Sequence, residues 1–149
     1  MKIAWNILLI LAMAVFMEFV AWYVHKDVMH GFLWVLHEDH HRPKGRGFQK
    51  NDLFAVFFSL VSMALIFTGV SDRRMPLVSL GLGMALYGAG YVLFHDIVFH
   101  HRFRAIRIKP RSRYLRRIVR AHAAHHQNSG RRNGVSFGFL YAGRQYDSD

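Results

Sequence analysis

Residues 53–94 read LFAVFFSLVSMALIFTGV at 53–70, SDRRMP at 71–76 and LVSLGLGMALYGAGYVLF at 77–94. Each apolar run is close to the shortest helix that crosses a hydrocarbon layer of about 30 Å. The segment between them is charged and ends in a proline, which cannot extend a preceding helix. The stretch therefore predicts two antiparallel membrane helices joined by a tight turn.

A third apolar run lies at residues 3–24 and is long enough to span a bilayer by itself. A cleaved signal peptide would have a more basic start and a small-residue cleavage site, whereas this run follows Lys2 and leads directly into a histidine. We therefore predict a retained membrane helix. Its carboxylate, Glu18, is expected to face another helix or water, because a charge is costly in lipid.

Charge divides the chain between two sides of the membrane. The 149 residues are 52% hydrophobic, yet their net charge is +11. With three spans, residues 25–52 and 95–149 share one side and carry all but three of the 20 lysines and arginines. By the positive-inside rule this side is the cytoplasm. The sequence predicts one all-α domain over residues 1–149, a membrane bundle with a cytosolic helical cap.

The region after the spans contains one further helical pattern and one short apolar segment. Ser112 can cap a helix over residues 112–127, in which Leu115, Ile118 and His122 recur on one face. We expect this helix to lie under the membrane, its arginines facing anionic lipid headgroups or an acidic electron-transfer protein. Residues 134–142 are too few to span, so a re-entrant fourth segment is the alternative to three spans.

Composition excludes several classes of site. Cysteine is absent, so the chain carries neither a thiolate zinc site nor an iron–sulfur cluster, and electrons have to come from another protein. Gly81 and Gly83 lie inside an apolar run, where a phosphate-binding loop is not expected. The apolar runs also disfavour nucleic-acid binding, which needs a basic face on a water-soluble core.

The 11 histidines all lie in three short windows, residues 25–41, 95–101 and 122–126. Interfacial or capping histidines have no reason to cluster in this way. Positions i, i+3 and i+4 share a helix face, so each of two triplets can converge on one point. The triplets are His37, His40 and His41, and His122, His125 and His126.

Two further histidine pairs have a spacing of five residues, His25 with His30 and His95 with His100. Such pairs share no face of a straight α-helix, so we expect them to bind from different sides or across a helix break. This many imidazoles exceeds the needs of one ion and favours two ions with four or five nitrogens each. Imidazole binds Zn, Cu, Fe and Ni, so spacing does not select the element.

The acidic residues exclude one type of metal site and leave two roles open for three aspartates. The four-glutamate type of di-iron site is excluded, because the glutamates are limited to Glu18 and Glu38. Three aspartates adjoin the histidines and either orient the imidazoles or remain solvated. They are Asp27, Asp39 and Asp96.

Two other functions compete with oxygen chemistry. His37, Glu38 and His41 match H-E-x-x-H, the zinc-protease signature in which the glutamate activates water, but this reading leaves the other histidines unexplained. A metal transporter is a second alternative. It would be expected to place ligands at mid-membrane, whereas the histidines here lie at the ends of the spans.

At these motifs the sequence resembles the membrane-bound fatty acid hydroxylase superfamily, and more closely its bacterial β-carotene hydroxylases. The resemblance covers most of residues 25–141 in order. It is carried by HKDVMHG at 25–31, LHEDHH at 36–41, HD at 95–96 through His100 to RF at 102–103, and YLRR at 114–117 leading to AHAAHH at 121–126. The early cluster, the short chain and the spacing from YLRR to the last histidines make the carotenoid match the more specific one.

The resemblance implies a ligand set and a reaction. The ligands carried over by position are His25, His30, His37, His40, His41, His95, His100, His122, His125 and His126, while His101 lies outside the family pattern and is a lesser candidate. It implies two iron ions, O2, electrons from ferredoxin or a similar donor, and a bacterial inner membrane. The implied reaction is hydroxylation of the β-ionone ring at carbon 3, from β-carotene through β-cryptoxanthin to zeaxanthin. A ketolase, a desaturase or another lipid hydroxylase remains an alternative.

Overall fold

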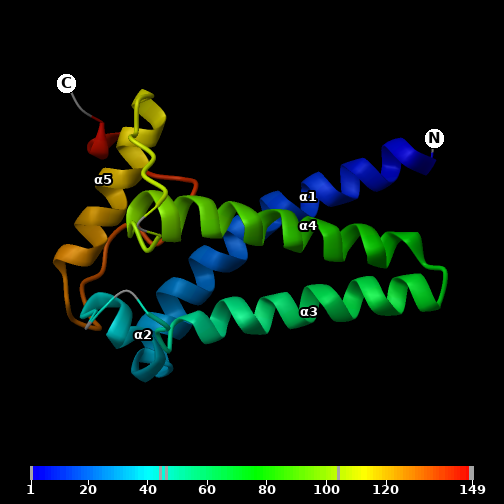
Figure 1. The fold of residues 1–149 in the computed structure, drawn as a ribbon, viewed down its shortest axis with the longest axis horizontal. Coiled ribbons are helices and arrows are strands. Elements are labelled where there is room, and N and C mark those ends of the chain that lie inside the picture. Colours follow the sequence, from blue (N-terminus) through cyan, green and yellow to red (C-terminus); the bar gives the residue numbers. More distant parts are fainter. Residues whose placement is uncertain (1, 44, 46, 104, 148–149) are drawn as a thin grey trace.

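Three long helical segments form the body of the computed structural model, which describes residues 2–43, 45, 47–103 and 105–147 (Figure 1). Helix α1 (Lys2–Tyr23) continues into the π-helix η1 (Val24–Phe32). Helix α3 (Asp52–Ser71) and helix α4 (Met75–Tyr91) form the hairpin, and the π-helix η2 (Val92–Phe99) extends α4. All three segments are long and apolar enough to cross a membrane, and each predicted apolar run lies within one of them.

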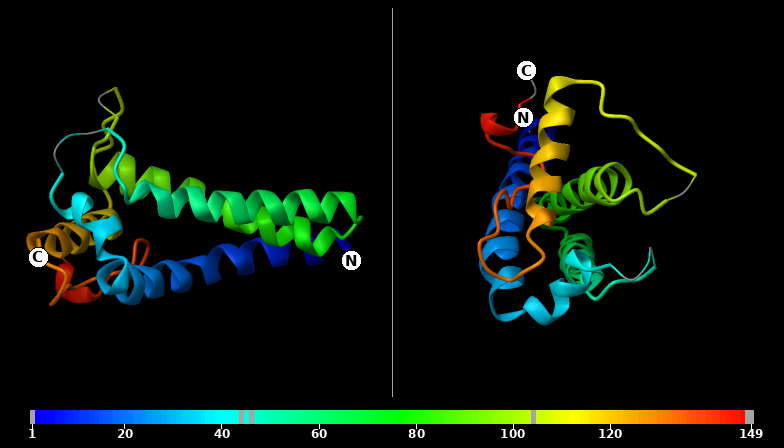
Figure 2. Two further views of the ribbon diagram at one scale, coloured as in Figure 1. Left: turned by 90° about the horizontal axis from the view of Figure 1, so that it is seen from below. Right: turned by 90° about the vertical axis from the view of Figure 1, so that its left-hand side faces the viewer.

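Two shorter helices form a cap at one end of this bundle. Helix α2 (Trp34–His41) and helix α5 (Arg113–Gln127) lie there, while the α3–α4 turn and the N-terminus lie at the opposite end (Figure 1). Viewed from the cap, α5 lies across the end of the bundle (Figure 2). Ser112 caps α5 as predicted, because its hydroxyl accepts a hydrogen bond from the Leu115 amide at 3.1 Å. A short 3-10 turn, η3 (Arg144–Tyr146), follows.

The segment between α5 and η3 forms no helix within residues 128–143, so the described chain has three helices that are long and apolar enough to cross a membrane, and residues 134–142 are not a fourth. The segment returns to α1, where the Glu18 carboxylate accepts hydrogen bonds from three consecutive amides, Phe139, Leu140 and Tyr141, at 2.8–3.1 Å. The other carboxylate oxygen of Glu18 accepts from the Tyr87 hydroxyl at 2.7 Å. Glu18 therefore satisfies amides that would otherwise lack acceptors beside an apolar span.

Glycines allow α4 to approach both of its neighbours. A Cβ on Gly83 would lie 2.6 Å from the Ile10 carbonyl oxygen of α1, and one on Gly81 would lie 2.8 Å from the Ser62 carbonyl oxygen of α3. Small residues at such positions permit close backbone packing in membranes. Further along α4, a Cβ on Gly88 or Gly90 would meet nothing within 4 Å, so these two glycines leave open space.

We expect Gly83→Ala to destabilise the bundle by about 1–3 kcal/mol, because the added methyl group overpacks the α1–α4 contact. Gly90→Ala is the matched control on the same helix, where an open position should gain a few tenths of a kcal/mol, up to about 1, from helix propensity. Thermal unfolding in detergent, followed by circular dichroism, compares the two. Equal midpoints for both variants would contradict the packing role of Gly83.

Candidate metal centre

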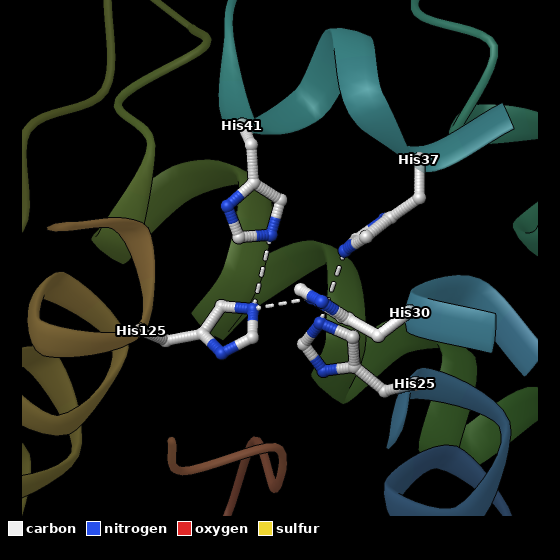
Figure 3. A group of neighbouring side chains, drawn as sticks. All are labelled: His25, His30, His37, His41 and His125. Carbon is white, nitrogen blue, oxygen red and sulfur yellow. Dashed lines mark hydrogen bonds between the residues drawn. The ribbon is translucent and has the colours of Figure 1, made fainter. Parts of the chain in front are cut away.

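Five imidazoles converge on one point at the cap end of the bundle (Figure 3). Each offers one ring nitrogen, and these nitrogens all lie within 4.8 Å of one another. The members of this first histidine group are His25 and His30 of η1, His37 and His41 of α2, and His125 of α5. Their Nε2 atoms approach closely, at 3.1 Å for His25–His37, 3.2 Å for His30–His125 and 3.1 Å for His125–His41.

A second histidine group lies beside the first and consists of His40, His100, His122 and His126. Within it, the Nε2 atoms of His122 and His100 are 2.8 Å apart. His95 adjoins this group, because its Nε2 lies 3.0 Å from that of His40. The predicted ligands thus gather into two sets of five imidazoles, an arrangement with the capacity for two ions.

Neighbouring histidines in the sequence belong to different groups. His40 and His41 separate in this way on α2, and His125 and His126 separate on α5. The prediction that each triplet meets at one point is therefore wrong. Positions i, i+3 and i+4 spread over about 100° of a helix face, so a helix placed between two centres directs part of a triplet to each. The groups remain in contact, since the rings of His41 and His126 stack at 4.5 Å.

The pairs spaced by five residues lie on π-helical turns. In a π-helix the hydrogen bond joins residues i and i+5, so these residues lie one above the other. The His100 amide donates to the His95 carbonyl oxygen at 3.0 Å, and the two rings are 4.6 Å apart. The rings of His25 and His30 are 5.3 Å apart. The rings of each pair therefore lie next to each other, which a straight α-helix does not allow, and a break at Gly31 follows the first pair.

The Nδ1 atoms of the first histidine group are all held by oxygen acceptors. Four of the rings donate to backbone carbonyl oxygens: His25 to that of Phe137 at 2.9 Å, His30 to that of Arg131 at 3.1 Å, His41 to that of Asn128 at 3.0 Å and His125 to that of Val135 at 2.7 Å. The fifth, His37, donates to the side-chain oxygen of Asn51 at 2.7 Å. Such bonds fix the proton on Nδ1 and orient each ring. The Nε2 atoms are thereby left as lone-pair donors.

Converging lone pairs make this first histidine group suitable for a cation. Burial lowers the pKa of His37 to about 2, of His41 to about 4 and of His125 to about 3, so these rings are neutral near pH 7. Neutral rings with Nδ1 already donating cannot hydrogen-bond to one another through Nε2. Their close approach is repulsive unless a positive charge lies between them, and the donor set therefore fits a divalent transition-metal ion.

Side chains of residues 49–52 and Arg102 support the second histidine group and His95. His40 Nδ1 donates to the Gln49 side-chain oxygen at 3.0 Å, and His95 Nδ1 to Asp96 at 2.9 Å. Arg102 binds Asp52 through both of its terminal nitrogens at 2.7 Å and reaches Asp96 at 3.4 Å. The ion pair with Asp52 raises the pKa of Arg102 above its usual value, so its charge is permanent.

The three aspartates that adjoin histidines in the sequence have different surroundings. Asp96 contacts a ligand candidate, whereas Asp39 accepts from the Lys50 amide at 2.7 Å. Asp27 is exposed, and no hydrogen bond within the described chain joins it to an imidazole. Gln49 and Asn51 were not identified from the sequence. Their signal is weak, two amides directly ahead of an apolar run, although Asn51 is only 2% exposed.

Two other residues lie outside the histidine groups. His101 is exposed and has a left-handed backbone with φ of 48°, and it belongs to neither group. Glu38 pairs with Arg42 at 2.7 Å on an accessible surface, although His37 and His41 lie together in the first histidine group. A protease would need Glu38 beside the metal-bound water, so its place in this ion pair disfavours the zinc-protease alternative.

Comparisons with known proteins agree with this geometry. The fatty acid hydroxylase family matches residues 10–142, which include both histidine groups. A β-carotene hydroxylase of Pantoea ananas is 43% identical over 93% of this chain and 78% of its own length. Another, from Paracoccus sp. (strain PC1), is 39% identical over 91% of this chain and 83% of its own length.

A chloroplastic β-carotene 3-hydroxylase of Gentiana lutea is 34% identical over 90% of this chain, which spans 42% of that longer protein. No solved structure matches the chain. Family match, extent of identity and paired histidine groups all agree. The chain therefore belongs to the fatty acid hydroxylase family and, within it, groups with the β-carotene hydroxylases.

Proposed function

We propose that this protein hydroxylates the β-ionone ring of carotenoids at carbon 3, converting β-carotene through β-cryptoxanthin to zeaxanthin. The reaction uses O2, two iron ions and electrons from a ferredoxin-type donor. The observation that carries the proposal is the convergence of ten imidazoles, in two sets, at the end of a membrane bundle. Relatives that are 38–43% identical and named β-carotene hydroxylases support the choice of substrate.

The protein's own part in this reaction is to hold and shield the centre. Iron, when bound, supplies the oxidising power that an unactivated ring carbon requires. The first histidine group, the second histidine group and His95 supply the ligand nitrogens, and the acceptors on their Nδ1 atoms keep the rings in place. The rings of Phe137 and Phe139 pack on His25 at 5.5 Å and 5.4 Å, so apolar side chains exclude water on this face.

We propose a bacterial inner membrane as the location, with the histidines on the cytoplasmic side and residues 1–149 acting as one domain. All but three of the lysines and arginines lie on the histidine side of the three spans, which supports this orientation. Arg113, Arg116 and Arg120 are exposed on α5. They offer a positive surface to anionic lipid headgroups and to an acidic electron donor.

Expression in cells that accumulate β-carotene and contain a working electron donor tests the proposal. We expect β-cryptoxanthin and zeaxanthin, identified by chromatography and mass, and neither product with an empty vector. Unchanged β-carotene beside a metal-loaded protein would refute hydroxylation of this substrate. Ring ketones in place of hydroxyl groups would instead identify a ketolase, and peptide cleavage or metal flux would point to the protease or the transporter.

A further inference from the structure

We propose that an apolar cavity between α1, α3 and α4 binds the ring end of the carotenoid. This inference rests on the proposed function and adds the location of its substrate. The cavity has a volume of about 350 Å³ and lies within the membrane-spanning part of the bundle. Its size suits a ring end group and not a whole carotenoid.

The chemistry of the cavity wall matches a hydrocarbon ring. Met17, Phe58, Met84 and Gly88 are among the residues that line it. The hydroxyl of Ser62, one of its few polar groups, already donates to the Gly81 carbonyl at 2.8 Å. A ligand without polar atoms therefore leaves no buried donor of Ser62 unpaired.

One end of the cavity lies next to the junction between the two sets of imidazoles. Phe139 lines the cavity, and its ring centroid lies 5.4 Å from those of both His25 and His95 and 6.4 Å from that of His122. It thus touches the first histidine group, the second histidine group and His95. Tyr91, also in the wall, stacks on His95 at 4.5 Å. The Phe139 ring therefore lies between a ring bound in this cavity and both sets of imidazoles.

The cavity is also accessible from the bilayer. Ala85 and Gly88 line it and are exposed on α4, and a Cβ on Gly88 would meet nothing within 4 Å. A carotenoid dissolved in lipid can therefore insert one ring between α3 and α4 while its polyene chain remains along the helices.

A larger cavity of about 1140 Å³ lies between α1, α4 and residues 136–146 and is the rival site. It is bounded by the Glu18 carboxylate, and Phe137 is the aromatic residue that connects it to the imidazoles. The Phe137 ring contacts His25, His30 and His125, which all belong to the first histidine group. A substrate in the larger cavity would lie beside the first histidine group and not beneath the junction between the two sets of imidazoles.

The test is to fill the smaller cavity. In Gly88→Leu the new side chain enters open cavity space, and in Gly90→Leu the same change falls on the same helix at an open position that does not line the cavity. We expect Gly88→Leu to lower bound β-carotene, measured by absorbance per purified chain in detergent, by about tenfold or more. Gly90→Leu should bind like the unmodified protein. Metal content and unfolding midpoint should be equal in the two variants.

Ala85→Leu, at a second cavity position, repeats the test if Gly88→Leu does not fold. Equal β-carotene binding by the cavity variants and Gly90→Leu would overturn the proposal. So would loss of binding in Ala14→Leu, which fills the larger cavity, or failure of the unmodified chain to bind β-carotene. Binding that depends on Gly88 without any hydroxylated product would support the cavity and refute only the proposed reaction.

Discussion

Replacing His125 with alanine should abolish hydroxylation and leave the first histidine group without its ligand from α5. The His125 side chain is fully buried, and its Nε2 lies 3.1 Å from that of His41 and 3.2 Å from that of His30. Loss of a residue that merely orients a ligand costs about 10- to 100-fold in metal affinity or activity, so loss of the ligand itself should cost at least about 100-fold. Iron per chain, measured by elemental analysis after purification, should also fall.

His101→Ala is the matched control for this prediction. His101 is an exposed histidine outside both groups, so its variant should retain iron and zeaxanthin formation. If His125→Ala kept its iron and activity, or if His101→Ala lost them, the assignment of the ligands would be wrong. Circular dichroism of both variants confirms that the comparison is made between folded proteins.

Removal of the Glu18 carboxylate should have the second largest effect, on stability and on metal retention together. In Glu18→Ala, the amides of residues 139–141 and the Tyr87 hydroxyl lose their acceptor. Each donor left unsatisfied in an apolar setting costs about 1–3 kcal/mol. Release of this segment also removes the Phe137 carbonyl from His25 and the Val135 carbonyl from His125.

The conservative variant Glu18→Gln separates positioning from simple loss of folding. Its amide oxygen can still accept from the three backbone amides, so it should recover most of the iron content that Glu18→Ala loses. The measurements are iron per chain and the unfolding midpoint in detergent. Full iron content in Glu18→Ala would show that the segment does not depend on this carboxylate, and equal iron loss in both variants would argue against the acceptor role.

Periodicity and composition were sufficient to predict the spans, because burial in lipid demands long apolar runs. They also predicted the helix at residues 112–127, since Ser112 and the apolar stripe are local signals. The windows of histidine likewise identified the candidate ligands, ten of which the structure brings together.

The parts that sequence did not reveal depend on geometry that side-chain patterns do not encode. The separation of His40 from His41 reflects where α2 lies between two centres, and the π-turns at His25 and His95 reflect local backbone hydrogen bonding. Four of the five acceptors on the first histidine group are backbone carbonyls, which every residue possesses. The path of residues 134–142 depends on Glu18. The sequence predicted that this carboxylate faces another helix or water, but it did not predict the backbone amides of residues 139–141 as its partners.

The late position of α5 in the chain sets an order of events during biosynthesis. The ribosome synthesises all three spans before it makes His122, His125 and His126 and the carbonyls of residues 128–137. Insertion of the first spans by the translocation machinery therefore begins before the two histidine groups can close. A nascent chain halted near residue 110 would already be anchored in lipid. We expect it to bind iron poorly, because the histidines of α5 and the carbonyl acceptors that follow α5 have not yet been synthesised.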